Sequence, residues 1–189
     1  MAGRVRRLVV GISGSSAPHL GERFLRACRD IPDLETHLVM SRGARRSIEV
    51  EMRVDPATVE ALATVAYDAS DMAAAVSSGS FLTHGMVVIP CSMSSLAGIA
   101  TGNATDLLRR AADVTLKERR PLVLVTRETP LNLVHLRNME TVTLAGGTIL
   151  PPVPAFYHAP ETIDDLLAHI CGKVLDALRI EHDLFRRWS

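Results

Sequence analysis

Residues 86–95 read Met-Val-Val-Ile-Pro-Cys-Ser-Met-Ser-Ser, an apolar run that passes directly into small hydroxyl residues. Residues 86–91 have no polar face, which is typical of a strand that is covered on both sides of a sheet. The serines that follow suit the start of a helix, where a serine side chain accepts a hydrogen bond from a free backbone N–H group. The stretch therefore predicts a buried strand that leads into a helix.

The same alternation of strand and helix continues on both sides of this stretch. Further strands are predicted at residues 8–11, 36–41, 122–125 and 148–150. Apolar periodicity predicts helices at residues 21–30, 44–52, 58–67, 92–101, 106–119, 131–144 and 160–178. Such an order predicts an α/β fold with a doubly wound parallel sheet, a Rossmann-like or flavodoxin-like three-layer sandwich. No linker or repeat interrupts the pattern, so a single domain over residues 1–189 is expected.

The composition limits the class of protein. Of the 189 residues, 47% are hydrophobic and 22% are charged, which is enough apolar material for a folded core. Lys and Arg together number 21, as do Asp and Glu, and this zero net charge argues against a nucleic-acid binder. No apolar run approaches the roughly 20 residues of a membrane-spanning helix. The run at residues 8–12 is too short for a signal-peptide core, so export is not expected.

The three cysteines, Cys28, Cys91 and Cys171, are far apart and odd in number. They match neither a disulfide framework nor the paired spacing of a zinc site, so we expect a cytoplasmic protein. No metal-binding motif and no Ser/His/Asp grouping occurs in the sequence, and no metal is expected. A catalytic role for Cys91 is not favoured, because no histidine lies near it in the sequence to lower its pKa.

Ligands of doubly wound sheets bind beyond the carboxyl ends of the strands. Here that rule selects residues 11–16, 41–51, 91–95 and 126–130. The first of these turns, Gly-Ile-Ser-Gly-Ser-Ser, lacks both the dinucleotide and the triphosphate fingerprints, and alone it suits an ordinary tight turn. Together with the serines of residues 92–95, its hydroxyl groups suit a phosphate at a helix N-terminus.

Two further segments carry functional groups. Arg127 and Glu128 follow a buried strand directly, where a guanidinium suits a phosphate oxygen and a carboxylate suits proton transfer. A surface ion pair is the alternative for these two residues. Residues 151–158, Pro-Pro-Val-Pro-Ala-Phe-Tyr-His, either cross the surface or hold a phenol rigidly near a cleft. The residues by themselves predict a protein that binds a phosphorylated small molecule.

Several long stretches resemble the UbiX family of flavin prenyltransferases, and the likeness covers nearly the whole chain. They are residues 87–100, 110–131, 151–158 and 172–176. Residues 35–41 and 77–81 resemble especially the branch known as the second subunit of phenolic (hydroxyarylic) acid decarboxylases. The resemblance implies an FMN-binding flavoprotein domain. It also implies a homododecamer in which subunits share sites.

The resemblance further implies a reaction. Such enzymes join a dimethylallyl group from dimethylallyl phosphate to N5 and C6 of reduced FMN, without a metal. The product, prenylated FMN, then serves as the cofactor of a separate UbiD-type decarboxylase. Whether the donor is the phosphate or the diphosphate is left open. Three other interpretations also stay open: a non-catalytic FMN carrier, an FMN-dependent decarboxylase of peptide C-terminal cysteine, and a direct decarboxylase.

Position within the resemblance assigns roles to individual residues. The FMN-binding residues would be Gly11, Ile12, Ser13, Ser41, Ser92, Met93, Ser94, Ser95 and Arg127. The prenyl phosphate would be held by Lys117, Arg127, Tyr157 and Lys173. The catalytic residues would be Ser13 beside the reacting edge of the flavin and two acids that move protons, Glu51 and Glu128. Three residues would serve the flavin of a neighbouring subunit, namely Glu51, Tyr157 and Lys173.

The chain departs from the family pattern at three places. The first turn is one residue longer before Gly21, which makes the position of Ser13 firmer than that of residues 15–20. Thr126 stands where a proline is common before the Arg-Glu pair. Lys173 occupies a position that can be arginine, so the charge is kept but the bidentate geometry of a guanidinium is lost.

Overall fold

The computed structural model describes residues 5–188 and contains a parallel sheet of six strands. The strands are β1 (Arg6–Ile12), β2 (Leu34–Met40), β3 (Val65–Tyr67), β4 (Gly85–Cys91), β5 (Leu122–Thr126) and β6 (Thr148–Ile149). The helices are α1 (His19–Arg29), α2 (Arg42–Ser47), α3 (Pro56–Glu60), α4 (Met93–Ala100), α5 (Leu107–Lys117), α6 (Leu133–Leu144) and α7 (Ile163–Ala177). A π-helix, η1 (Ile48–Met52), follows α2, and a short 3-10 helix, η2 (Ala75–Ser77), precedes β4.

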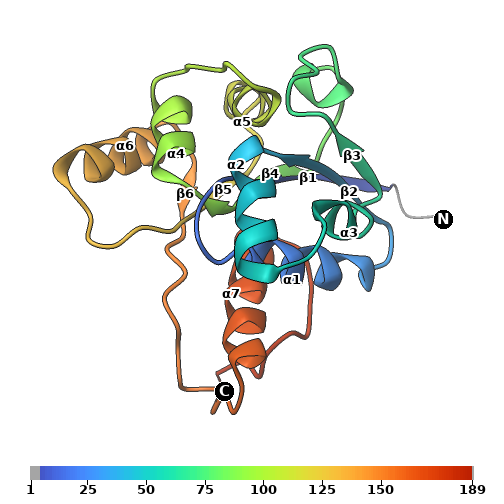
Figure 1. Cartoon of the computed structure of the whole chain (residues 1–189), viewed down its shortest axis with the longest axis vertical. Helices are drawn as coiled ribbons and strands as arrows, with labels where there is room; N and C mark the ends of the chain where they lie inside the picture. Colours follow the sequence, from blue (N-terminus) through green and yellow to red (C-terminus); the bar gives the residue numbers. More distant parts are fainter. Residues whose placement is uncertain (1–4, 189) are drawn as a thin grey trace.

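The strand order across the sheet is β3-β2-β1-β4-β5-β6, and every neighbouring pair is parallel. This is the order of the Rossmann fold, so the doubly wound α/β prediction is confirmed and its Rossmann-like form applies. The chain runs outward from β1 to β3 and then returns to β4 on the other side of β1 (Figure 1). The direction of winding therefore reverses between β1 and β4, which is where such folds bind ligands.

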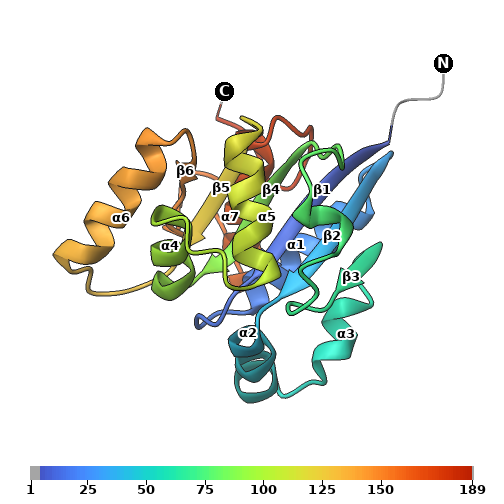
Figure 2. The same ribbon diagram turned by 90° about the horizontal axis from the view of Figure 1, so that it is seen from above.

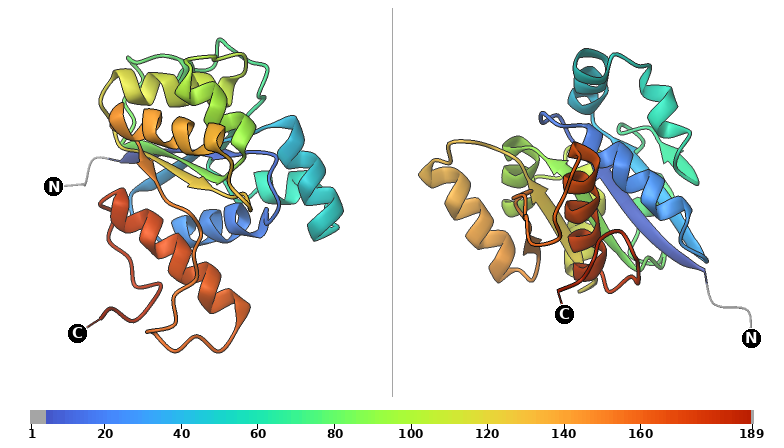
Figure 3. Two further views of the ribbon diagram at one scale, coloured as in Figure 1. Left: turned by 90° about the vertical axis from the view of Figure 1, so that its left-hand side faces the viewer. Right: turned by 90° about the horizontal axis from the view of Figure 1, so that it is seen from below.

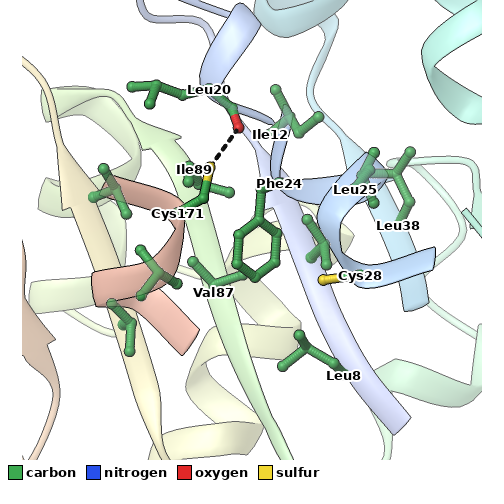
Figure 4. Packing of buried hydrophobic residues seen from close by; sticks show 14 of the residues in the cluster. Leu8, Ile12, Leu20, Phe24, Leu25, Cys28, Leu38, Val87, Ile89 and Cys171 are labelled. Atoms are coloured by element: carbon green, nitrogen blue, oxygen red, sulfur yellow. Dashed lines mark hydrogen bonds between the residues drawn. The ribbon is translucent and has the colours of Figure 1, made fainter. Parts of the chain in front are cut away.

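Helices cover both faces of the sheet (Figure 2). Alternate residues of β1 and β4 point to opposite faces, as the pleat of a strand requires. Leu8 and Ile89 belong to the cluster that packs under α1 and α7, whereas Val9 and Met86 belong to the cluster under α5. Phe24 lies at the centre of the first cluster (Figure 4). Both faces of these strands are thus buried, which explains why the strands read as unbroken apolar runs.

Two local predictions were wrong. The helix expected at residues 58–67 ends with α3 at Glu60, and the edge strand β3 follows it. Thr64 starts this strand by exchanging hydrogen bonds with Thr36, from Thr36 N to Thr64 Oγ1 (3.0 Å) and from Thr64 N to Thr36 Oγ1 (3.1 Å). The partner strand supplies these bonds, so the local pattern could not reveal them. The helix expected at residues 44–52 is helical but changes to π geometry at Ile48.

No helix in the described part of the chain is long and apolar enough to cross a membrane. The three cysteines are free and buried. Burial raises the pKa of the Cys91 thiol to about 12, so at neutral pH this group is a packed thiol and not a nucleophile.

A buried histidine joins β2 to β3. His37 is 5% exposed, and its Nδ1 lies 2.9 Å from the hydroxyl oxygen of Tyr67. Burial lowers the pKa of His37; Glu35, whose carboxylate lies 3.8 Å from Nε2, opposes this shift, and Arg7 adds to it. The neutral ring is therefore favoured in the folded chain.

We expect this histidine to destabilise the fold in acid. The unfolded chain takes up the proton near pH 6.5 and the folded chain only at lower pH, so the stability that the neutral ring contributes is present above about pH 6.5 and is lost below it. A single proton limits the loss to about 1.4 kcal/mol per pH unit. Thermal unfolding of the wild type and of His37→Gln from about pH 8 to pH 5 measures the effect. The wild type's advantage should shrink toward acid, and an advantage that stays constant would contradict the assignment.

Candidate functional site

The candidate site lies at the carboxyl ends of β1 and β4, where the winding reverses. Ser13 ends β1, is 1% exposed, and donates from Oγ to the carbonyl oxygen of Pro90 (3.0 Å). The same hydroxyl oxygen accepts a hydrogen bond from the backbone N–H of Ser92 (2.7 Å). The hydroxyl of Ser13 therefore joins the first turn to the turn after β4, and in this chain it acts by holding the two turns together.

Serines begin the helices that follow β2 and β4. Ser41 caps α2 by accepting a hydrogen bond from Ala44 N (3.1 Å). Ser92 caps α4 by accepting from Ser95 N (3.2 Å), and its hydroxyl donates to Ser95 Oγ (3.2 Å). Further into α4, Met93 is half-buried. The predicted helix starts are thus confirmed, and the N-terminus of α4 lies beside the first turn.

Exposure divides the other predicted FMN-binding residues. Ile12 is buried in the core, and a Cβ placed on Gly11 would lie 3.2 Å from Leu108, so these two residues can offer a ligand only their backbone. Ser94 is exposed and accepts a hydrogen bond from the guanidinium of Arg109 (3.1 Å). Ser95 is buried beneath the first turn of α4.

Two glycines allow the first turn to approach α2. A Cβ built on Gly14 would lie only 2.8 Å from the Cα of Gly43. In the opposite direction, a Cβ on Gly43 would lie 3.1 Å from the Cα of Gly14. Because the contact joins two backbones, a side chain at either position forces a main-chain shift.

We expect Gly14→Ala to weaken FMN binding about tenfold or more, because a shift of about an ångström in a binding turn is costly. Both glycines are exposed, so the thermal midpoint should change little. Titration of FMN with the protein, followed by quenching of flavin fluorescence, measures the affinity. Gly43→Ala is the matched control and should have a smaller effect, since its Cβ has more room. Equal affinities in the wild type and Gly14→Ala would contradict this account of the turn.

The backbone of Arg127 connects three parts of the site. Its N–H donates to the carbonyl oxygen of Cys91 (3.1 Å), and its carbonyl oxygen accepts from Ser15 Oγ (3.0 Å). The half-buried Arg127 guanidinium has no ion pair or hydrogen bond within residues 5–188. Glu128 is exposed, and its Oε1 accepts only from Thr129 N (3.1 Å) among the same residues. Arg127 and Glu128 therefore do not form the surface ion pair that was the alternative for them.

The residues present fit the phosphate end of FMN. The first backbone N–H groups of α4 have no partner inside the helix, and a helix N-terminus favours an anion. The Arg127 guanidinium adds a positive charge beside it. The hydroxyl of Thr126, where the family usually has proline, is buried and has no hydrogen-bond partner in the described chain. All three groups stand at the carboxyl edge of the sheet and suit phosphate oxygens.

Glu51 contacts its own first turn. Its Oε2 accepts hydrogen bonds from Ser16 Oγ (3.0 Å) and from Ala17 N (2.9 Å). Ala17 has a left-handed backbone (φ 66°), which lets the longer turn bend back toward α1. Within one chain, this carboxylate therefore braces the segment where the sequence departs from its family, while it stays exposed.

Lys117 lies at the opposite edge of the sheet. Helix α5 runs antiparallel to the strands, so its last residue reaches the amino end of β5. There Lys117 forms an ion pair with Glu118 and lies against the loop at Gly79. One chain therefore does not bring Lys117 to Arg127, although both were expected to hold the same phosphate.

Tyr157 and Lys173 lie in a third place, on the outer side of α7 (Figure 3). The Tyr157 hydroxyl oxygen lies 2.8 Å from His169 Nε2. Lys173 follows one turn later on the helix and donates from Nζ to Asp176 Oδ2 (3.3 Å). The four-residue phosphate clamp expected from the sequence is thus divided among three parts of a single chain.

Several residues of this third place were missed by the sequence analysis. Asp176 accepts hydrogen bonds from Lys173 and from Arg187 (2.8 Å), and its Oδ1 lies 3.1 Å from His182 Nε2. Burial acts to raise the pKa of Asp176, but the hydrogen bonds from Arg187 and Lys173 outweigh it and hold that pKa low. The spacing of His169, Lys173 and Asp176 places them on one helix face, which is the signal that could have identified them.

A cavity of about 520 Å³ lies at the amino edge of the sheet, away from the residues above. Its lining includes Arg119 and Arg179, which follow the last residues of α5 and α7. Cations beside helix C-termini compensate the negative end of the helix dipole. These arginines therefore have a structural role, and the cavity is not part of the candidate site.

Comparison with known proteins places the chain in a family. The family model described as Flavoprotein matches residues 2–175. The flavin prenyltransferase UbiX of Escherichia coli (strain K12) is 52% identical over 187 residues, which cover 98% of this chain and 99% of that protein.

Solved structures show the same likeness. The structure of AnUbiX (PadA1) in complex with FMN and dimethylallyl pyrophosphate has a TM-score of 0.95 and 50% identity, and covers 98% of each chain. A dodecameric FMN-dependent UbiX-like decarboxylase from Escherichia coli O157:H7 has a TM-score of 0.94 and 50% identity over 97% of this chain and 99% of that one. The peptidyl-cysteine decarboxylase EpiD, at 11% identity, 92% and 98% coverage and a TM-score of 0.66, shares only the fold. Because full-length identity reaches half with UbiX proteins, the chain belongs to the UbiX family of flavin prenyltransferases.

Proposed function

We propose that this protein transfers a dimethylallyl group from dimethylallyl phosphate to reduced FMN and releases prenylated FMN. The observation that carries the proposal is the half-buried Arg127 guanidinium, which has no carboxylate partner in the described chain and stands beside the first turn and α4. In this reaction the C–O bond of the allyl phosphate breaks, phosphate leaves, and the flavin gains one C₅H₈ unit. A free cation at a phosphate-type turn is what a phosphate-releasing reaction needs.

The chain's own residues would bind and orient FMN through the backbone of residues 11–15, the N-terminus of α4 and Arg127. When bound, reduced FMN supplies the electron-rich ring that accepts the allyl group. Ser13 keeps the two turns in register, and Ser41 and Ser92 hold the helices that flank them. Glu128 would exchange a proton at this edge, because its exposed carboxylate makes only one local hydrogen bond.

Other subunits would complete the phosphate site. Lys117, Tyr157 and Lys173 lie away from Arg127 within one chain, and all three side chains are at least partly exposed. Subunit sharing in a homododecamer would bring them to a neighbour's Arg127, and Glu51 would act at a neighbour's flavin. Support comes from the dodecameric relative at 50% identity. Because AnUbiX was solved with the pyrophosphate, both prenyl donors should be tested.

We further propose a cytoplasmic location and a UbiD-type decarboxylase as the recipient of the product. The three free buried cysteines suit a reducing compartment. The recipient follows from the chemistry, because a prenylated flavin made by one protein is useful only to an enzyme that uses it as a cofactor.

Anaerobic incubation with FMN, dithionite and dimethylallyl phosphate tests the function. Mass spectrometry of the extracted flavin should show a gain of one C₅H₈ unit. Recovery of unchanged FMN from protein that binds it would favour the carrier alternative. Release of CO₂ from aromatic acids by this protein alone would favour a direct decarboxylase, and release from a peptide with a C-terminal cysteine would favour the cysteine decarboxylase.

A further inference from the structure

The outer face of α7 holds a histidine whose environment the proposed reaction leaves unexplained. His169 is 5% exposed, yet its Nε2 lies 2.8 Å from the hydroxyl oxygen of Tyr157. Tyr157 itself is 47% exposed. A buried ring thus touches the polar atom of a phenol that faces solvent.

Packing fixes the position of the His169 ring. His158 stacks on it with ring centroids 4.7 Å apart and planes inclined by 8°. Phe185, from the C-terminal segment, lies at 4.7 Å on the other side. Phe185 can approach because Gly172 has no side chain: a Cβ there would lie 2.5 Å from the ring of Phe185. The ring of His169 therefore has little freedom to turn away from Tyr157.

The hydrogen-bonding capacity of His169 favours one direction for its proton. Burial lowers the pKa of His169, with His158 and Lys173 acting in the same direction, so the ring is neutral and carries one N–H. Its Nδ1 is buried and has no partner within the described residues. A proton on Nδ1 would be a buried donor without an acceptor, whereas a proton on Nε2 meets the Tyr157 oxygen. An unpaired acceptor is the more tolerable of the two.

We infer that His169 is a positioning residue that donates from Nε2 to the Tyr157 oxygen and so turns the phenol's own O–H outward, toward a phosphate monoester. The inference rests on the proposed function for the identity of that ester. An outward O–H is a donor, which is what an anionic phosphate oxygen accepts. With the opposite tautomer, the phenol would spend its proton on His169 and present only lone pairs to an anion.

Cations surround the outward side of the phenol. Lys173 lies one helical turn from His169, and Arg187 lines a cavity of about 190 Å³ together with Tyr157 and Trp188. Both cations are held by Asp176. An anion that accepts from Tyr157 therefore meets two positive charges whose present partner is a single carboxylate.

The test compares His169→Phe, which keeps an aromatic ring without the N–H, with His169→Gln, whose amide N–H can replace it. Binding of dimethylallyl phosphate to the FMN-loaded protein is measured by calorimetry. Trp188, the single tryptophan of the chain, lies 5.9 Å from Tyr157 and reports locally by fluorescence. Inorganic phosphate is titrated in parallel, which separates recognition of the phosphate group from recognition of the prenyl chain.

We expect His169→Phe and Tyr157→Phe each to raise the Kd for dimethylallyl phosphate roughly five- to tenfold, the effect of one lost hydrogen bond to a charged group. The double variant should be no weaker than Tyr157→Phe, because the two residues act as one unit. His169→Gln should stay within about twofold of the wild type. His84→Phe, which loses a 2.8 Å contact to the carbonyl of Leu178 at the other edge, is the matched control and should bind normally.

Two results would overturn the inference. One is wild-type affinity in His169→Phe while Tyr157→Phe is weakened. The other is an equal loss in His169→Phe and His169→Gln, which would show that only the shape of the ring matters. Failure of the proposed function is distinguished by mass: if FMN gains no C₅H₈ but the binding pattern holds, the donor tautomer stands and the reaction does not.

Discussion

The Glu128→Gln variant is expected to form prenylated FMN at least about 100-fold more slowly than the wild type, the usual loss when a general acid or base is removed. Glutamine has the same shape and keeps an oxygen that can accept from Thr129 N, the only hydrogen bond of Glu128 in residues 5–188. It cannot release or take up a proton. FMN affinity and thermal midpoint should therefore be unchanged while turnover falls.

Single-turnover formation of the product under anaerobic conditions measures this rate, with mass detection of the flavin. Glu140→Gln is a matched control, because Glu140 is exposed on α6 and lies outside the candidate site. A rate equal to that of the wild type would remove Glu128 from the chemistry. Equal rates with no product in either protein would instead support the carrier alternative.

Replacing Arg127 by glutamine is expected to lower kcat/KM for prenyl transfer roughly 100- to 1000-fold, or about 3–4 kcal/mol, the usual effect of removing a preorganised donor. The side chain has no partner in the described chain, so its loss breaks no bond of the folded protein. The bonds that anchor the turn belong to the backbone: Arg127 N to Cys91 O (3.1 Å) and Ser15 Oγ to Arg127 O (3.0 Å). The fold should persist while ligand binding fails.

Steady-state kinetics and FMN titration of the same preparations measure both effects. Arg127→Lys should recover part of the activity, because it restores the charge but not the planar pair of donors. Arg29→Gln, at the exposed end of α1, controls for the loss of one positive charge from the surface. If Arg127→Gln keeps the wild-type kcat/KM and FMN affinity, the free guanidinium is not a ligand-binding group.

Local sequence patterns predicted the strands at the centre of the sheet well, and the edge of the sheet poorly. The residues of β4 are buried on both faces, so their apolar character is visible in the sequence itself. Strand β3 has three residues, two of them exposed, and it exists because β2 and Thr36 offer partners. A short strand of that kind leaves little periodic signal, which is why its residues were mistaken for helix.

The candidate site was predicted in kind but not in arrangement. Ser13, Ser92 and Arg127 follow strands whose carboxyl ends must meet in a parallel sheet, so their proximity could be expected. Lys117 could not be placed in this way, because the antiparallel direction of α5 carries it to the other edge. The contact of His169 with Tyr157 joins residues that come together only when residues 150–162 fold back over α7.

The sequence by itself determined the alternation of strands and helices, the position of the phosphate-type turns and the family, since each depends on residues adjacent in the chain. Only the tertiary structure decided the tautomer argument for His169, the free state of the Arg127 guanidinium and the separation of Lys117 from it. The physical reason is range. Propensity and capping act over a few residues, whereas burial and hydrogen bonding between distant residues depend on how the helices pack around the sheet.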